Sequence, residues 1–239
     1  MGHLFLVRHA QASFLSQNYD QLSELGETQS RLLGEYWSRR RVVFDRVCTG
    51  TAKRHQETAR IVGDAYRRDG LKFPEPVILE EFDEFYGEAV LSQSLPQLLK
   101  QDARIRELHD ALQNSNTETE KRANFQRLFE AVISMWVHEE IAPRNVETWQ
   151  EFCARVNRGL TTFQGNGAKG EVVAIFTSGG PLSVVVQRSL HLSAQDTLRI
   201  AWMARNCSFS KFLFSGDRLT LGSFNSFPHL DDDSLLTYR

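Results

Sequence analysis

An arginine and a histidine directly follow a short apolar run near the start of the chain. Leu4-Phe5-Leu6-Val7 has the composition of a buried parallel strand, and Arg8-His9 comes at its end. In open α/β sheets, ligands usually bind at the carboxyl ends of the strands. There an imidazole can attack phosphorus while a guanidinium binds the phosphoryl oxygens with its planar fork. Arg8 and His9 therefore predict a site for a phosphoryl group.

A second arginine follows another strand-like segment. Residues 45–48 predict a short strand, and residues 49–59 lead from it into a helix that begins near Ala52. The first N–H groups of such a helix have no intrahelical partner and favour anions. Arg54 falls in the first turn, where it can meet Arg8 across one phosphoryl group. An isolated arginine is more often a solvated surface residue, so Arg54 supports a phosphate site only in combination with the groups at the other strand ends.

Two further strand ends carry groups that suit the same chemistry. Glu81 follows the predicted strand 77–79, and a carboxylic acid there can protonate a leaving oxygen. The neighbouring acids Glu80 and Asp83 are alternatives for the residue that faces the site. After the predicted strand 172–176, the chain reads Thr177-Ser178-Gly179-Gly180-Pro181 and turns into a helix predicted from 182 to 190. The N–H groups at such a helix start favour anions.

The elements that position these groups alternate between strand and helix. Ser23 is predicted to cap a helix, and the last segments, 209–213 and 219–223, predict a closing hairpin. This alternation predicts an α/β fold, a three-layer αβα sandwich with a mostly parallel sheet. We expect residues 1–239 to form one domain, with a helical insertion at about 84–147 as a candidate cap. The apolar stripe of that insertion, which runs from Phe125 to Trp136, is predicted to be core.

Five segments, in order and spacing, resemble the histidine phosphatase superfamily, which includes the cofactor-dependent phosphoglycerate mutases. They are Leu6-Val7-Arg8-His9, Leu22-Ser23-Glu24-Leu25-Gly26, Thr49 to Ala59, Leu79-Glu80-Glu81-Phe82-Asp83, and Asn225 to Leu230 as a C-terminal strand. The resemblance spans nearly the whole chain. It implies that His9 becomes phosphohistidine, that Arg8 and Arg54 bind the phosphoryl group, and that Glu81 protonates the leaving alcohol. The implied function is a phosphatase that hydrolyses a phosphomonoester.

The sequence departs from the family pattern at three positions. Ala10 replaces a customary glycine, and Glu57 replaces a customary glutamine. The third departure matters most, because Ser178 stands where the family has a second histidine that stabilises charge on the transferred phosphoryl group. Loss of such a donor typically costs about 3 kcal/mol, roughly a hundredfold in rate. We expect Ser178 and the N–H groups of Gly179 and Gly180 to bind a phosphoryl oxygen in its place and to recover part of this loss. His55 and His229 are candidates to replace the missing imidazole, although a structural or surface role is the more common one for a histidine.

Three other functions compete with an active phosphatase. A domain that keeps Arg8, His9 and Arg54 can bind a phosphorylated ligand or partner without turnover, which would explain Ser178. A mutase is less favoured, because the short stretch after His9 leaves little room for a substrate loop. A serine hydrolase would use Ser178 with His229 as base and Asp231 as orienting acid, but it leaves the arginines without a role. Residues 165–170 fit a GxGxxG pattern but follow a helix, so we expect a plain turn.

Composition narrows the class of protein. The 239 residues carry a formal net charge of -2, which gives no reason to expect a nucleic-acid or membrane surface as partner. The expected partner is instead a small phosphorylated substrate or a phosphoprotein; the oligomeric state is not readable. Three cysteines without a CxxC pair indicate a reducing compartment, and we expect a cytoplasmic protein. We expect neither metal nor cofactor, because Arg8 and Arg54 supply the positive charge and no ligand cluster has metal spacing.

Overall fold

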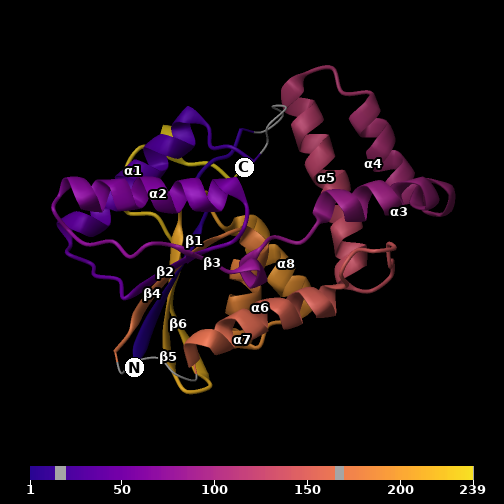
Figure 1. Ribbon diagram of the computed structural model, residues 1–239. Helices are drawn as coiled ribbons and strands as arrows, with labels where there is room; N and C mark the ends of the chain where they lie inside the picture. The colour runs from indigo at the N-terminus through magenta and orange to yellow at the C-terminus, as the bar shows by residue number, and fades with distance from the viewer. Residues whose placement is uncertain (14–19, 165–169, 239) are drawn as a thin grey trace. The chain divides into compact units, whose positions relative to one another are not determined.

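The structure is a computed structural model, and it describes residues 1–13, 20–164 and 170–238 (Figure 1). The strands are β1 (Gly2–Arg8), β2 (Arg46–Thr49), β3 (Val77–Ile78), β4 (Val172–Thr177), β5 (Phe209–Ser215) and β6 (Arg218–Ser226). The helices are α1 (Glu24–Arg39), α2 (Lys53–Arg68), α3 (Gly87–Gln101), α4 (Ala103–Gln113), α5 (Glu118–Val137), α6 (Trp149–Gln164), α7 (Gly179–Leu190) and α8 (Ala194–Met203). The GxGxxG-like segment falls almost entirely outside the described residues.

The chain forms two compact units, which we call unit 1 and unit 2. Unit 1 comprises Met1–Glu84 and Ala154–Arg239, and unit 2 comprises Phe85–Cys153. Unit 1 contains the whole sheet and the ends of all its strands. Every residue that the sequence singles out for chemistry therefore belongs to unit 1.

The sheet of unit 1 is mixed, with the strand order β3-β2-β4-β1-β5-β6. β1, β2, β3 and β4 pair in parallel, whereas β5 and β6 form an antiparallel hairpin added to β1. The predicted α/β class with a mostly parallel sheet is confirmed. The central strands β1 and β4 lie side by side, with Arg8 opposite Thr177, so their carboxyl ends meet at one edge.

Helices cover both faces of this sheet, α1 and α2 on one and α6 and α7 on the other (Figure 1). Alternation along the strands sends Phe5 and Val7 into the core beneath α1 and α2, where they pack with Leu33, Trp37 and other apolar side chains. β4 is buried along nearly its whole length, as expected of a strand with helices on both sides. This packing fixes the strand ends against α2 and α7.

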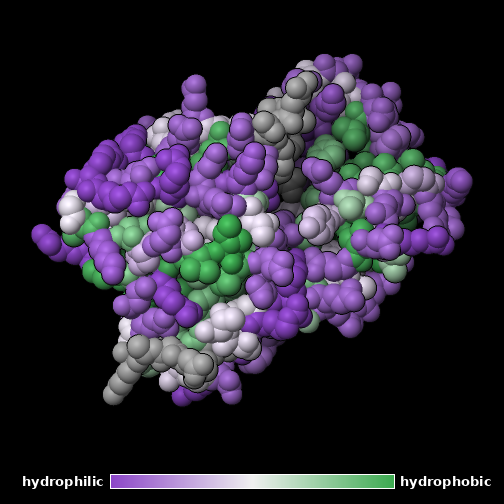
Figure 2. Space-filling model, in the orientation of Figure 1, coloured by the Kyte–Doolittle hydropathy of each residue, from purple (hydrophilic) through white to green (hydrophobic). Residues whose placement is uncertain are grey.

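One sheet edge is barely covered. Val77 and Ile78 of β3 are 57% and 53% exposed, and an apolar patch lies near the position of β3 (Figure 2). β3 is only two residues long, and so short an edge strand offers few unpaired backbone groups to another chain.

Several local predictions are confirmed and others are wrong at the boundaries. Ser23 caps α1, accepting a hydrogen bond from the Gly26 N–H at 3.0 Å. α7 begins at Gly179 instead of 182, because Gly179 and Gly180 already take helical positions. The predicted strand 225–230 is confirmed only for Asn225 and Ser226 and is wrong beyond them, since β6 ends at Ser226 and Pro228 has no N–H for a ladder. The sequence reading did not distinguish α8.

Unit 2 has its own core, built on one apolar stripe of α5. Leu128, Val132, Ile133 and Trp136 are buried, so the prediction that this stripe is core is confirmed for them. Phe125 and Phe129, at its N-terminal end, are only half-buried. Trp136 stacks on Phe85 with ring centroids 5.0 Å apart and packs edge-on against Trp149. The N-terminus of α5 is fixed by a capping box, which satisfies backbone N–H groups that the helix leaves open.

Candidate functional site

His9 lies at the carboxyl end of β1, where backbone contacts hold it on both sides. Its N–H donates to the Thr177 carbonyl of β4 at 2.8 Å, and its carbonyl accepts from the Asn206 side chain at 3.2 Å. The ring Nδ1 lies 2.8 Å from the Ala10 carbonyl oxygen. A carbonyl can only accept, so Nδ1 carries the proton and Nε2 keeps its lone pair. In this tautomer Nε2 is the ring nitrogen that can act as a nucleophile.

Burial, followed by the charges of the Arg54 and Arg8 guanidinium groups, holds the pKa of the His9 ring well below its usual value. A neutral imidazole is the form that can attack an electrophile, so the two arginines keep His9 reactive while offering charge to an anion. Arg8 is anchored by a hydrogen bond from Nη1 to the Ala204 carbonyl. Arg8, His9 and Arg54 thus lie together, as the sequence predicts.

Thr58 ties the end of β1 to the first turn of α2. Its hydroxyl accepts from the Ala10 N–H at 3.1 Å and donates to the Arg54 carbonyl at 2.7 Å. One buried side chain therefore sets both the chain after His9 and the turn that carries Arg54.

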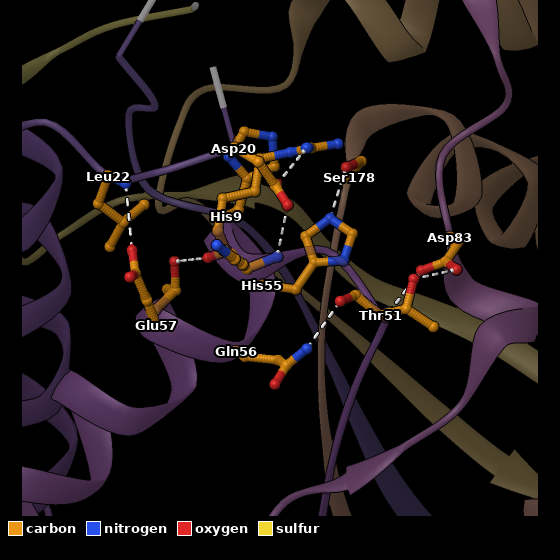
Figure 3. Close-up of polar contacts among 12 residues, drawn as sticks. His9, Asp20, Leu22, Thr51, His55, Gln56, Glu57, Asp83 and Ser178 are labelled. Carbon is orange, nitrogen blue, oxygen red and sulfur yellow. Dashed lines mark hydrogen bonds and ion pairs between the residues drawn. The ribbon is translucent and has the colours of Figure 1, made fainter. Parts of the chain in front are cut away.

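Ser178 lies at the end of β4, and a histidine from α2 reaches it. His55 Nε2 is 2.7 Å from Ser178 Oγ, and both side chains are buried (Figure 3). The His55 ring centroid lies 5.6 Å from that of His9. Burial and the charge of Arg54 hold the pKa of His55 well below its usual value, so this imidazole is neutral. We call Arg8, His9, Arg54, His55 and Ser178 the His9 cluster.

The other candidate histidine lies elsewhere in unit 1. The His229 ring stacks on Phe209 at 6.3 Å and lies 6.0 Å from Tyr36. The serine-hydrolase pairing of Ser178 with His229 is therefore not what the structure shows, because the histidine bonded to Ser178 is His55.

The acidic residues after β3 occupy different places. Glu81 lies in a 3-10 helix (Glu80–Phe82), where Gly159 of α6 packs against its side chain. Asp83 accepts from the N–H and the hydroxyl of Thr51, both at 2.6 Å. Glu84, which the sequence analysis did not consider, accepts from the Gly180 N–H at 3.1 Å, at the start of α7. Glu84 thus places a hydrogen-bonded carboxylate at the start of α7, two residues after Ser178.

A carboxylate also lies on Arg54. Asp20 accepts from Arg54 Nη1 at 2.7 Å and from the Lys53 N–H at 2.9 Å, at the N-terminus of α2 (Figure 3). Ala52, the N-cap of α2, has no side-chain hydrogen bond to the helix. Asp20 therefore uses the guanidinium and the backbone donor that suit an anion.

Metal and membrane features can be judged over the described part of the chain. Residues 1–13, 20–164 and 170–238 contain no group of three or more His, Cys, Asp or Glu that could hold a metal ion. No helix among them is long and apolar enough to cross a membrane.

The mixed sheet carries His9, two arginines and a buried hydroxyl where its parallel strands end, which is the arrangement of an α/β protein with charged and polar groups at the strand ends. Comparison of the sequence with family models gives the histidine phosphatase superfamily (branch 1), matched over residues 4–90 and 88–226. The chain belongs to the histidine phosphatase superfamily. A search of curated proteins gave no match.

Solved structures share this fold at low sequence identity. The Shigella flexneri alpha-ribazole phosphatase matches with a TM-score of 0.60 and 20% identity, over 94% of this chain and 96% of that one. A mycobacterial glucosyl-3-phosphoglycerate phosphatase, in complex with inorganic phosphate, matches with a TM-score of 0.61 and 18% identity, over 96% of this chain and 99% of that one. The Bacillus anthracis phosphoglycerate mutase matches with a TM-score of 0.61 and 16% identity, over 96% of this chain and 95% of that one. These likenesses show the fold, which phosphatases and a mutase share.

Proposed function

We propose that the protein is a phosphatase that hydrolyses a phosphomonoester through a phosphohistidine at His9. The observation that carries this proposal is the geometry of His9, whose Nδ1 donates to the Ala10 carbonyl and leaves Nε2 free to attack. Arg8 and Arg54 supply positive charge beside that ring, so the reaction needs no metal.

The reaction has two steps. His9 Nε2 attacks phosphorus, the bond between phosphorus and the ester oxygen breaks, and a carboxylic acid protonates the leaving alcohol. Water then attacks phosphorus, the bond between phosphorus and Nε2 breaks, and the same carboxylate takes the proton from water. The products are an alcohol and inorganic phosphate. Glu81 is the acid that the family resemblance implies, and Glu84 is a second candidate because of its place at the start of α7.

The proposed substrate is a small phosphorylated molecule or a phosphoprotein. Cys48, Cys153 and Cys207 are reduced thiols, which supports the expected cytoplasmic location. The mutase alternative requires a bound phosphoenzyme that excludes water until the second substrate arrives, a stricter demand than hydrolysis.

The test is hydrolysis of para-nitrophenyl phosphate and several natural phosphomonoesters with EDTA present, for wild type and His9→Ala. We expect turnover with EDTA, loss of turnover in His9→Ala, and an acid-labile, base-stable phosphoenzyme in wild type only. Binding of inorganic phosphate without turnover of any ester would instead favour a phosphate-binding module, the alternative that Ser178 suggests.

A further inference from the structure

His55 and Ser178 form a buried pair beside His9, although they come from different elements. Their side chains are 0% and 1% exposed, and the hydrogen bond between them joins α2 to the end of β4. The ring also packs over Gly50, where an added Cβ would lie 2.4 Å from His55 Nδ1. The same Cβ would lie 2.5 Å from Asp83 Oδ1, so a side chain at position 50 would require the His55 ring or the Asp83 carboxylate to move.

Ser178 is the N-cap of α7, yet its hydroxyl makes no capping hydrogen bond. The N–H of Gly180 is satisfied instead by the Glu84 carboxylate. The usual task of a serine in this position is thus taken by another side chain. The Ser178 hydroxyl is left to His55 and to whatever binds at the end of β1.

The surroundings of His55 favour one tautomer. Among the described residues, no group is hydrogen-bonded to its Nδ1, which is buried. A buried N–H without an acceptor is rarer and costlier than an unmatched lone pair, so the proton belongs on Nε2. His55 then donates to Ser178 Oγ, and the Ser178 hydroxyl keeps its own hydrogen for a further acceptor.

The end of β4 brings that hydrogen close to His9. Thr177, the residue before Ser178, is paired with Arg8 and accepts from the His9 N–H. A Cβ built on Gly179 would lie 3.9 Å from Arg8 Nε. A phosphoryl group on His9 between the two guanidiniums therefore lies within the neighbourhood of Ser178.

We propose that His55 and Ser178 together replace the second imidazole that the family resemblance expects at position 178. His55 donates to Ser178 Oγ, and the Ser178 hydroxyl donates to an oxygen of the phosphoryl group during transfer. Ser178 is then a catalytic residue, and His55 is a positioning residue that acts through it. A donor chain of this kind polarises its terminal hydroxyl. The inference rests on the proposed phosphatase function and explains how Ser178 is compatible with activity.

A nucleophilic Ser178 is a weaker use of the same pair. A serine nucleophile needs its histidine as base, with a third group holding the other ring nitrogen. His55 Nδ1 makes no hydrogen bond among the described residues. Asp83 Oδ1 lies beside the same ring, over Gly50, but it accepts from the Thr51 N–H at 2.6 Å instead. The proton on Nε2 also leaves that nitrogen unable to act as a base.

The test is a set of variants that remove the imidazole at position 55 and place one at position 178. We expect His55→Ala and Ser178→Ala each to lower kcat/KM for para-nitrophenyl phosphate about a hundredfold, the usual effect of losing one preorganised donor. The double variant His55→Ala/Ser178→Ala should be no worse than either single one, because the pair acts as a unit. His55→Ala/Ser178→His should recover at least about tenfold over His55→Ala, because the imidazole then enters from β4 into the space vacated on α2.

Control variants and vanadate binding distinguish a failure of the His55–Ser178 proposal from a failure of the phosphatase proposal. His9→Ala/Ser178→His should stay inactive, and His229→Ala, a buried histidine outside the His9 cluster, should keep the wild-type kcat/KM. Wild-type turnover that His55→Ala leaves unchanged would overturn the role of His55 but not the phosphatase. If wild type hydrolyses nothing, the proposed function fails, and calorimetric binding of vanadate still tests the pair. Weaker vanadate binding in both single variants would support the donor chain, and unchanged binding would overturn it.

Discussion

His55 and His229 are both buried, yet they belong to regions of unit 1 with opposite character. His55 meets a hydroxyl, a second imidazole and the charge of Arg54 at the edge of the sheet. His229 lies among aromatic rings, stacked on Phe209 and near Tyr36. Burial lowers the pKa of both, to about 4 for His229, so depth and pKa alone do not distinguish a site histidine from a core histidine. The polar groups around the ring distinguish them.

The largest expected effect comes from removing the nucleophile. His9→Ala should lower the hydrolysis rate on the order of a thousandfold or more, because the variant lacks the imidazole that is proposed to accept the phosphoryl group. His229→Ala should lower the thermal stability and leave the rate below the melting temperature unchanged. Steady-state kinetics and thermal unfolding of both variants check this contrast. Equal losses of activity in the two would remove the distinction between the regions.

The next effect decides which carboxylate belongs to the site. Replacement of the acid by glutamine should lower the rate with an alkyl phosphate about a hundredfold, since the leaving alcohol loses its proton donor. The loss should be smaller with para-nitrophenyl phosphate, whose leaving group needs little protonation. Measuring Glu81→Gln and Glu84→Gln side by side assigns the role to one of them. A uniform loss across both leaving groups would argue that neither carboxylate acts as the acid.

The contrast between His55 and His229 also explains which parts of the site the sequence could and could not predict. Arg8, His9 and Arg54 come directly at a strand end or in the first helical turn, so local patterns placed them near one edge. The pairing of His55 with Ser178 joins residues 123 positions apart, and only the packing of α2 against β4 brings them together. The sequence therefore left His55 and His229 as equal candidates. Glu84 was missed because its partner, the Gly180 N–H, is a backbone group.

A smaller effect concerns the pH dependence of stability. Between pH 6.5 and 4 the unfolded chain protonates His229 while the folded chain does not, so stability is lost as the pH falls through this range. His9 and His55 act in the same direction. When the pH falls from 7.5 to 5.5, we expect the free energy of unfolding of His229→Phe to drop by about 1 kcal/mol less than that of wild type. Urea unfolding at the two pH values measures this, and identical losses would show that His229 is protonated in the folded protein.

The smallest expected effect concerns Asp20, whose carboxylate lies on Arg54 and on the Lys53 N–H. Asp20→Asn keeps a hydrogen-bonding side chain but removes a negative charge from a place suited to phosphate. The Asp20 side chain is 42% exposed, so the ion pair is partly screened, and the gain in phosphate affinity should be about threefold. Calorimetric titration with inorganic phosphate at low and high salt measures it, and the gain should shrink at high salt. Weaker binding in Asp20→Asn would mean that Asp20 holds Arg54 in place instead of competing with the anion.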